Sequence, residues 1–381
     1  MAIPIKGVEF LPPLVTTEEA VKLYKKCAEV NRKIGKLNAD MQSSIVNTSL
    51  FQILSFQESV QSTRIEGTQV TFSDIIDEAN RTEKSDEVQE VENYRKALQL
   101  GVSFIEAGNP ITTRIIKEIH SVLMSEDVRG TCSSKGEFRR IQNYIGPKGC
   151  TEKNASYIPV SANLIPEYMT NLEYYINGEE HSSFFVQKKE EGKFMLDKDS
   201  DPLIKTAVLH AQFESIHPFL DGNGRTGRIL IVLNTLKDGL MNQPVFFVSE
   251  ELEKEKIRYY NALNGIRGEN ADWFTWLDFF LEASNRMAEN QLEKLERIDQ
   301  LAKDGCKFLN EAGFDSTIRY WLLSFSNLYI SAREAAEFLK VTPSTARKHL
   351  NILTDLNMLH VDKQLQRNKI YINYDLLREI D

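Results

Sequence analysis

The chain has 381 residues, which is room for two or three domains, and a formal net charge of −9. This charge argues against nucleic-acid binding over the whole surface, and no apolar stretch reaches the length of about 18 residues that a membrane-spanning helix requires. No signal-peptide pattern begins the chain, and the cysteines form neither a C-x-x-C pair nor a metal-ligand spacing: Cys27, Cys132, Cys150 and Cys306. These features predict a location in the reducing cytoplasm.

The first informative element is a helix expected at about residues 47–67. It is indicated by an apolar stripe at helical spacing, formed by Leu50, Ile53, Leu54 and Val60. Ser62 and Glu66 are four residues apart and therefore share one face of this helix. Glu66 lies at the negative end of the helix dipole, where a carboxylate is unfavourable, so an arginine partner would offset that cost.

Two segments with fewer candidate functional residues follow. Taken alone, residues 136–146 and 157–160 indicate an ordinary β-hairpin between helices. Residues 187–201 are rich in charge and are expected to form a solvated loop to which we assign no chemistry.

The stretch 217–228 reads His-Pro-Phe-Leu-Asp-Gly-Asn-Gly-Arg-Thr-Gly-Arg and is predicted to join two helices. Pro218 closes the first helix, since the residue before a proline is biased away from helical geometry. Gly222 and Gly224 permit positive φ and close backbone approach, so successive N–H groups can form an anion nest. The nest opens onto the N-terminus of the second helix, which also favours negative charge.

The charged groups of this stretch support the same interpretation. Arg225 and Arg228 share a helix face in the first turn, where each cation opposes the dipole at a cost of roughly 0.3–1 kcal/mol. A bound polyanion would reverse the sign of that effect. Asp221 offers a hard oxygen ligand for Mg²⁺, and His217 can accept a proton from an attacking hydroxyl.

Two other interpretations explain this stretch less well. A glycine-rich turn with a satisfied histidine would explain single residues but not the joint pattern. The glycines also meet the G-x-G-x-x-G spacing of dinucleotide-binding folds, through Gly222, Gly224 and Gly227. That motif must follow a β-strand, whereas here it follows a helix.

Beyond residue 286 the pattern changes. Residues 287–314 are expected to form a connecting helix. Ser331 and Glu334 form a capping box for the next helix, and Thr342 caps another that starts at Pro343. An alternating strand pair then follows, so residues 315–381 are similar to a winged helix-turn-helix domain.

The C-terminal region is locally basic, with six Lys or Arg against two Asp between residues 340 and 369. Three of the charged or titratable side chains fall on the second helix of the turn: Arg347, Lys348 and His349. Three more fall on the strand pair, or wing: Lys363, Arg367 and Lys369. Both DNA and a protein partner remain open for residues 315–381.

The stretch 217–228 resembles the signature of the Fic family, H-P-F-x-D/E-G-N-G-R-x-x-R, and meets each of its specified positions. Further similarity extends over roughly residues 40–285. The resemblance implies a mainly α fold, a helical bundle with a small β-hairpin flap. It also implies transfer of AMP from ATP to a Ser, Thr or Tyr hydroxyl of a target protein or of the chain itself.

The resemblance assigns roles to the residues of the motif. His217 would be the catalytic base and Asp221 the Mg²⁺ ligand. The ATP phosphates would contact Gly222, Asn223, Gly224, Arg225 and Arg228. Phosphotransferases of the Doc type carry lysine at the position of Gly224, so this glycine favours nucleotidyl transfer over phosphoryl transfer.

Other family features are implied outside the motif. Tyr157, Ile158 and Pro159 would belong to the flap, which docks an extended piece of the target by main-chain hydrogen bonds. The family usually has a second proline where this chain has Val160. Tyr259 and Tyr260 would line the pocket for adenine and ribose, although aromatic pairs in helices are more often core packing.

The resemblance also implies a built-in inhibitor. Ser62, Glu66 and Gly67 fit the pattern S/T-x-x-x-E-G/N, whose glutamate pairs with the second motif arginine, here Arg228, and blocks the γ-phosphate. The expected organisation is an N-terminal helical region (1–110), a catalytic core (111–286), the connecting helix (287–314) and the C-terminal domain (315–381). A homodimer, removal of AMP, another nucleotide donor, and a DNA-binding regulator that only senses nucleotide remain alternatives.

Overall fold

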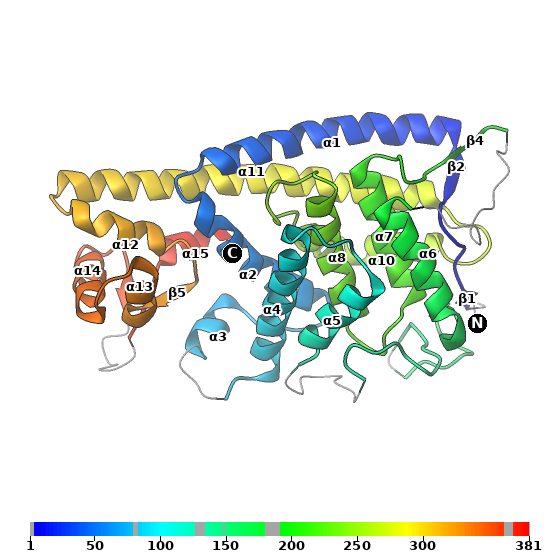
Figure 1. Cartoon of the computed structure of the whole chain (residues 1–381), viewed down its shortest axis with the longest axis horizontal. Helices are drawn as coiled ribbons and strands as arrows, with labels where there is room; N and C mark the ends of the chain where they lie inside the picture. Colours follow the sequence, from blue (N-terminus) through cyan, green and yellow to red (C-terminus); the bar gives the residue numbers. More distant parts are fainter. Residues whose placement is uncertain are drawn as a thin grey trace.

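A computed structural model describes the chain at residues 4–78, 83–125, 134–147, 149–179, 191–361 and 369–380. The described part is mainly helical, as the sequence predicts. Two long helices lie side by side along the molecule (Figure 1), α1 (Thr17–Ser43) and α11 (Trp273–Glu311). α1 begins at a capping box in which the Thr16 hydroxyl accepts the Glu19 N–H and the Glu19 carboxylate accepts the Thr16 N–H.

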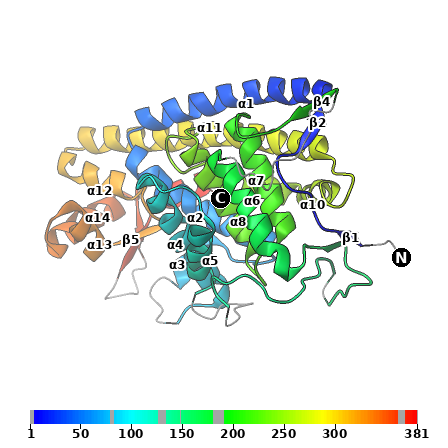
Figure 2. The same ribbon diagram turned by 45° about the vertical axis from the view of Figure 1, so that its right-hand side comes forward.

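The helical core is built on α7 (Pro202–Ile216) and α8 (Asn223–Lys237), which pack closely on each other. Nearly every residue of both helices is buried, so neither has the one-sided apolar stripe of a surface helix. The described residues add seven further helices to this part: α2 (Asn47–Ile65), α3 (Phe72–Asp77), α4 (Asp86–Glu106), α5 (Thr113–Leu123), α6 (Ile165–Asn177), α9 (Ser249–Lys254) and α10 (Lys256–Gly265). Figure 2 labels all of them except α9. A 3₁₀ turn, η1 (Ala162–Leu164), precedes α6.

Short strands tie the N-terminal segment to the helical core. β1 (Ile5–Lys6) pairs in parallel with β3 (Tyr157–Ile158), and β2 (Leu14–Thr16) pairs antiparallel with β4 (Lys193–Met195). The prediction of an uninterrupted loop at 187–201 is therefore wrong at β4. β4 forms by pairing with β2 near the start of the chain, so the local sequence could not predict this strand. Residues 187–190 of the predicted loop lie outside the described residues.

The hairpin expected at 136–160 is shorter than predicted. A single antiparallel bridge joins Ile145 to Tyr157, with N···O distances of 2.9 and 3.0 Å. The other edge of β3 is taken by β1, where the Ile5 and Gly7 N–H groups donate to the Ser156 and Ile158 carbonyls. Both edges of β3 are thus paired along this short segment.

The C-terminal region adds a small α/β unit. In order it contains η3 (Asp315–Thr317), α12 (Ile318–Leu323), β5 (Tyr329–Ser331), α13 (Ala332–Leu339), α14 (Pro343–Asp355), β6 (His360–Val361), β7 (Ile370–Ile372) and α15 (Tyr374–Ile380). The three strands form an antiparallel sheet in the order β5-β7-β6. The capping box of Ser331 and the cap of Thr342 are confirmed.

The segment predicted as a connecting helix is the second half of α11, which continues without a break from the helical core into the C-terminal unit. Gly305 lets α11 and α12 approach each other closely, because a Cβ at this position would collide with the indole of Trp321. The Trp321 Nε1–H donates to the Ala302 carbonyl at 3.0 Å. In the part of the chain that the structure describes, no helix is long and apolar enough to span a membrane.

Candidate active site

The predicted phosphate loop connects α7 to α8 and is closed by its own side chains. His217 ends α7 in the left-handed region (φ 50°), and Gly222 (φ 74°) precedes α8. The Asn223 amide accepts the Phe219 N–H and donates to the Phe219 carbonyl, both at 2.9 Å. The Asn223 side chain therefore fixes the loop, and the backbone N–H groups in the first turn of α8 remain for an anion.

His217 is held in a neutral, half-buried state beside two cations. Burial, together with the positive charges of Arg267 and Arg139, lowers the pKa of His217 to about 3. The Arg139 Nε–H donates to the His217 carbonyl at 2.8 Å, and the Arg267 Nη2–H donates to the Glu214 carbonyl at 3.3 Å. A neutral imidazole can accept a proton at neutral pH.

Arg139 and Arg267 were not identified from the sequence. Arg139 also donates to the Ile141 and Val160 carbonyls, so one buried guanidinium joins the flap region to the loop. Arg267 is 7 % exposed and stacks over the Tyr157 ring at 4.0 Å. Arg139 lies in the stretch that resembles the flap, which was a usable signal; nothing local marks Arg267.

Arg225 and Asp221 lie at the other end of the loop. The Arg225 side chain is 4 % exposed, and its guanidinium stands 3.7 Å from Glu90 and 3.8 Å from Asp221. Among the residues that the structure describes, its buried Nε and Nη1 have no hydrogen-bond partner. A buried donor without an acceptor costs free energy, so an anionic ligand that accepts hydrogen bonds from Arg225 would remove this cost.

Asp221 fits a magnesium ion that is bound mostly by other oxygens. Its side chain is 46 % exposed. Among the described residues, no group of three His, Cys, Asp or Glu side chains could hold a metal ion by itself. Mg²⁺ commonly uses one or two carboxylates together with water and substrate phosphates, so a single Asp221 is compatible with it.

Arg228 is fully engaged by the N-terminal helix α2. Its Nη2–H donates to Glu66 Oε1 at 2.7 Å and to the Ser62 carbonyl at 2.9 Å, and its Nε–H donates to Ser62 Oγ at 2.7 Å. Burial alone would raise the pKa of Glu66, but the Arg228 charge and hydrogen bond hold it below its ordinary value. The two predicted inhibitory side chains and the second motif arginine thus form one cluster.

Gly224 lies directly beneath this ion pair. A Cβ at position 224 would collide with Glu66 Oε1 and lie 3.0 Å from Arg228 Nη1. The absence of a side chain at this position lets the Glu66 carboxylate rest on the first turn of α8. The same space would be open to a phosphate if the Glu66 carboxylate moved away.

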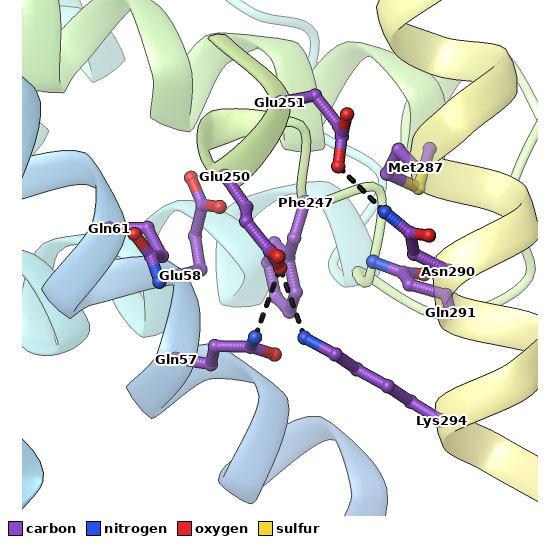
Figure 3. Close-up of a pocket in the computed structure, with 10 residues that line it drawn as sticks. All are labelled: Gln57, Glu58, Gln61, Phe247, Glu250, Glu251, Met287, Asn290, Gln291 and Lys294. Atoms are coloured by element: carbon purple, nitrogen blue, oxygen red, sulfur yellow. Dashed lines mark hydrogen bonds and ion pairs between the residues drawn. The ribbon is translucent and has the colours of Figure 1, made fainter. Parts of the chain in front are cut away.

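The helix that carries Glu66 is anchored to α9 and α11. The Gln57 amide and the Lys294 ammonium both donate to Glu250 Oε2, at 3.1 and 3.0 Å (Figure 3). At the next residue of α2, Glu58 Oε1 accepts hydrogen bonds from the Tyr94 hydroxyl and from the Ser249 hydroxyl. These contacts fix the position from which Ser62 and Glu66 reach Arg228.

The buried Glu58 carboxyl makes stability depend on pH. Burial raises the pKa of Glu58 to about 7, against opposing donors from Ser249 and Tyr94 and the Arg228 charge. Because the pKa is higher in the folded state, this group favours folding at low pH and opposes it as pH rises through about 7. We expect Glu58→Gln to gain about 1–3 kcal/mol of unfolding free energy, increasingly between about pH 5 and pH 8.

Thermal or urea unfolding across this pH range measures the effect. Glu250→Gln is the matched control in the same pocket, because Lys254 and Lys294 lower the pKa of Glu250 against the effect of burial. This control should gain no stability as pH rises. A Glu58→Gln advantage that stays constant with pH would contradict the assignment.

The two candidate adenine residues are placed differently. Tyr259 is 1 % exposed and packs against Trp276 and Phe279, and its hydroxyl lies 2.9 Å from His210 Nε2. Tyr260 is 40 % exposed. Of the pair, Tyr260 therefore offers ring surface to a base, whereas the Tyr259 ring belongs to the core.

The predicted flap residues are more buried than the side chains of an exposed docking strand would be. Tyr157 is fully buried, and its hydroxyl donates to the Ser215 carbonyl at 2.7 Å. Ile158 is 8 % exposed, and Pro159 is buried. A surface groove runs beside them between β1, the flap and α6, and its walls include Lys6, Gln142, Tyr144, Val160, Leu164 and Tyr168.

Comparison with known proteins agrees with this architecture. Residues 110–234 match the Fic/DOC family, and residues 24–103 match the Fic/DOC family N-terminal region. The chain therefore belongs to the Fic/DOC family.

Curated relatives named "Protein adenylyltransferase Fic" are similar to part of the chain. The protein from Drosophila erecta is 30 % identical over 155 residues, which are 40 % of this chain and 24 % of that protein. The protein from Culex quinquefasciatus is 28 % identical over 181 residues, which are 47 % of this chain and 29 % of that protein. The similarity thus spans about a quarter of the length of these relatives.

Two solved structures share the fold. A Fic family protein from Desulfovibrio desulfuricans superposes with a TM-score of 0.55 and 18 % identity, covering 96 % of this chain and 98 % of that one. A Fic domain containing signaling protein from Bacteroides thetaiotaomicron has a TM-score of 0.50 and 18 % identity, covering 69 % and 98 %. At this identity the similarity shows the fold alone.

Proposed function

We propose that this protein transfers AMP from ATP to a side-chain hydroxyl of a target protein or of itself, and that Glu66 inhibits the transfer. One observation carries the proposal. A neutral His217, two arginines and an open helix N-terminus meet at a single loop, and one of the arginines is occupied by a carboxylate of the same chain. The names of the curated relatives support the same reaction class.

In the proposed reaction, the first turn of α8 and Arg225 bind the ATP polyphosphate through N–H groups and positive charge. Mg²⁺ held by Asp221 would neutralise phosphate charge. Arg228 would bind the terminal phosphate once Glu66 has left it. Because these groups are fixed before ATP arrives, they stabilise the developing charge without reorganisation.

The chemical step is a substitution at the α-phosphorus of ATP. The target hydroxyl oxygen forms a bond to this phosphorus while its proton passes to the His217 imidazole. The bond from the α-phosphorus to the bridging oxygen breaks, and pyrophosphate leaves with that electron pair. The groove beside the flap, next to the carbonyl contacts of Arg139, is our candidate for the target segment.

Two related reactions use the same groups. The site could accept another nucleoside triphosphate, or Glu66 could orient water to remove AMP from a modified protein. Incubation of the protein with labelled ATP and, separately, with each other labelled nucleoside triphosphate distinguishes these reactions. Covalent label on protein supports transfer, and loss of label from a modified protein supports removal.

We further propose that residues 315–381 form a winged-helix domain that recruits a partner. The order of α12, β5, α13, α14, β6 and β7, with its three-stranded antiparallel sheet, supports this assignment. Arg347 and Lys348 are exposed on α14, whereas His349 stacks on Tyr320 and lies 2.9 Å from the Thr317 hydroxyl. Lys363 and Arg367 of the predicted wing lie outside the described residues.

The exposed pair on α14 gives a test for DNA as the partner. The full-length protein should bind duplex DNA with steep salt dependence, and Arg347→Glu with Lys348→Glu should lower the salt slope by about 2 if each side chain contacts one phosphate. Fluorescence anisotropy over a salt series measures this. No duplex binding at low salt would leave a protein partner. Specific DNA binding without any nucleotide transfer would instead favour a nucleotide-sensing regulator.

A further inference from the structure

His120 on α5 lies at the junction of the phosphate loop and the flap region. It is 3 % exposed, and its ring is stacked on Phe219 of the loop at a centroid distance of 3.7 Å and an interplanar angle of 7°. None of the roles described above uses this buried histidine. Its two ring nitrogens contact two different backbone segments.

The hydrogen bonds of His120 determine its tautomer. The Gly136 N–H donates to His120 Nδ1 at 3.0 Å. A backbone N–H can only donate, so Nδ1 carries no proton and the neutral ring must carry its proton on Nε2. His120 Nε2 lies 3.0 Å from the Asp221 carbonyl, to which it therefore donates.

A single peptide group links the His120 hydrogen bond to the Asp221 carboxylate. The Asp221 C=O and the Gly222 N–H belong to the same planar peptide unit. On the far side of that unit, the Gly222 N–H donates to Asp221 Oδ1 at 2.6 Å. The His120 ring thereby fixes the peptide that holds the carboxylate proposed for Mg²⁺.

The surroundings allow this peptide little freedom. A Cβ at Gly222 would lie 2.9 Å from Met124 Sδ and 3.3 Å from His120 Nε2, so α5 presses directly on the loop at this point. Gly222 also has a φ of 74°, which residues with a side chain rarely adopt. Position 222 therefore needs glycine both for its conformation and for the approach of His120.

We propose that His120 is a positioning residue that orients the Asp221–Gly222 peptide for binding of magnesium–ATP, and that it simultaneously ties this peptide to Gly136 at the start of the flap region. The proposal rests on the proposed nucleotide transfer for its kinetic consequence. The hydrogen-bonding geometry itself does not depend on that reaction.

Two amide variants separate the two contacts. In His120→Gln the side-chain amide can replace the Nε2 donor to Asp221, whereas in His120→Asn the amide oxygen can replace the Nδ1 acceptor for Gly136. In a Glu66→Gly background, we expect the KM for magnesium–ATP to rise about tenfold in the Asn variant and less than about threefold in the Gln variant, with kcat little changed in both. Thermal unfolding of both variants reports on any loss of folding.

Equal KM changes in the two variants, or a loss confined to kcat, would overturn the positioning role. A packing role alone would lower thermal stability without separating Gln from Asn. If the Glu66→Gly parent transfers nothing, the proposed function fails, and the calorimetric affinity of each variant for magnesium–ATP takes the place of KM with the same expected order.

The tautomer can be observed in the wild-type protein without any measurement of activity. The chain has six histidines, so ring-nitrogen NMR of the wild-type protein can resolve them, and the His120 signal is the one lost in either variant. At neutral pH we expect a neutral ring protonated on Nε2. A ring protonated on Nδ1, or a doubly protonated ring, would overturn the proposal.

Discussion

Replacing Glu66 with glycine is expected to raise the transfer of AMP to protein by about 10- to 100-fold. The change removes a charge-assisted hydrogen bond to Arg228, a class of contact worth about 1.5–3 kcal/mol, which the γ-phosphate must otherwise displace. It also opens the space over Gly224 that the Glu66 carboxylate fills. Initial rates of label incorporation from ATP, compared between wild type and variant at equal concentration, measure the effect.

Ser62→Ala is the graded control for this experiment. It removes the hydroxyl that accepts the Arg228 Nε–H but leaves the carboxylate in place, so we expect a smaller increase in rate. Unchanged activity of the Glu66→Gly variant over a range of protein concentrations would exclude inhibition by Glu66. A larger effect of Ser62→Ala than of Glu66→Gly would also contradict the account.

Replacing His217 with alanine is expected to lower the transfer rate by at least about 100-fold, the lower end of what a positioned general base contributes. The imidazole is neutral at every pH well above 3, because burial and the adjacent Arg267 and Arg139 lower its pKa to about 3. For the same reason, the rate above about pH 5 should show no titration of this ring. A pH–rate profile of the Glu66→Gly protein measures that feature.

Magnesium–ATP binding separates loss of the base from loss of the site. His217→Ala leaves Arg225, Arg228 and the α8 N-terminus in place, so its affinity for magnesium–ATP should stay within about threefold of the parent in a Glu66→Gly background. Substantial transfer by the His217→Ala variant would show that another group accepts the proton.

The parts of the site that the sequence could predict are those encoded over a few consecutive residues. The loop 217–222, its proline and Gly222 follow from local backbone rules, and the caps at Ser331 and Thr342 follow from side-chain reach over three residues. Glu66 and Arg228 are 162 residues apart in the sequence. The position of Glu66 at a helix end therefore predicts only that it needs a cation, and the family pattern specifies Arg228 as that cation.

Other parts depend on tertiary packing and could not be predicted. Arg267 comes from a loop after α10, and its charge matters to His217 only because the fold brings the two segments together. Tyr259 and Tyr260 are adjacent and chemically alike, yet the packing of α10 on α11 buries one and exposes the other. Pairing of β1 with β3 likewise joins segments some 150 residues apart, which no local pattern encodes.

We propose that the site is a nucleotide transferase held inactive by its own glutamate. Intact mass measurement of the Glu66→Gly protein after incubation with magnesium–ATP, beside Glu66→Gly/His217→Ala, tests it most directly. The account predicts a mass gain of one or more AMP groups in the first protein and none in the second. No adduct on the Glu66→Gly protein or on an added protein extract, or an equal gain in both variants, would contradict it.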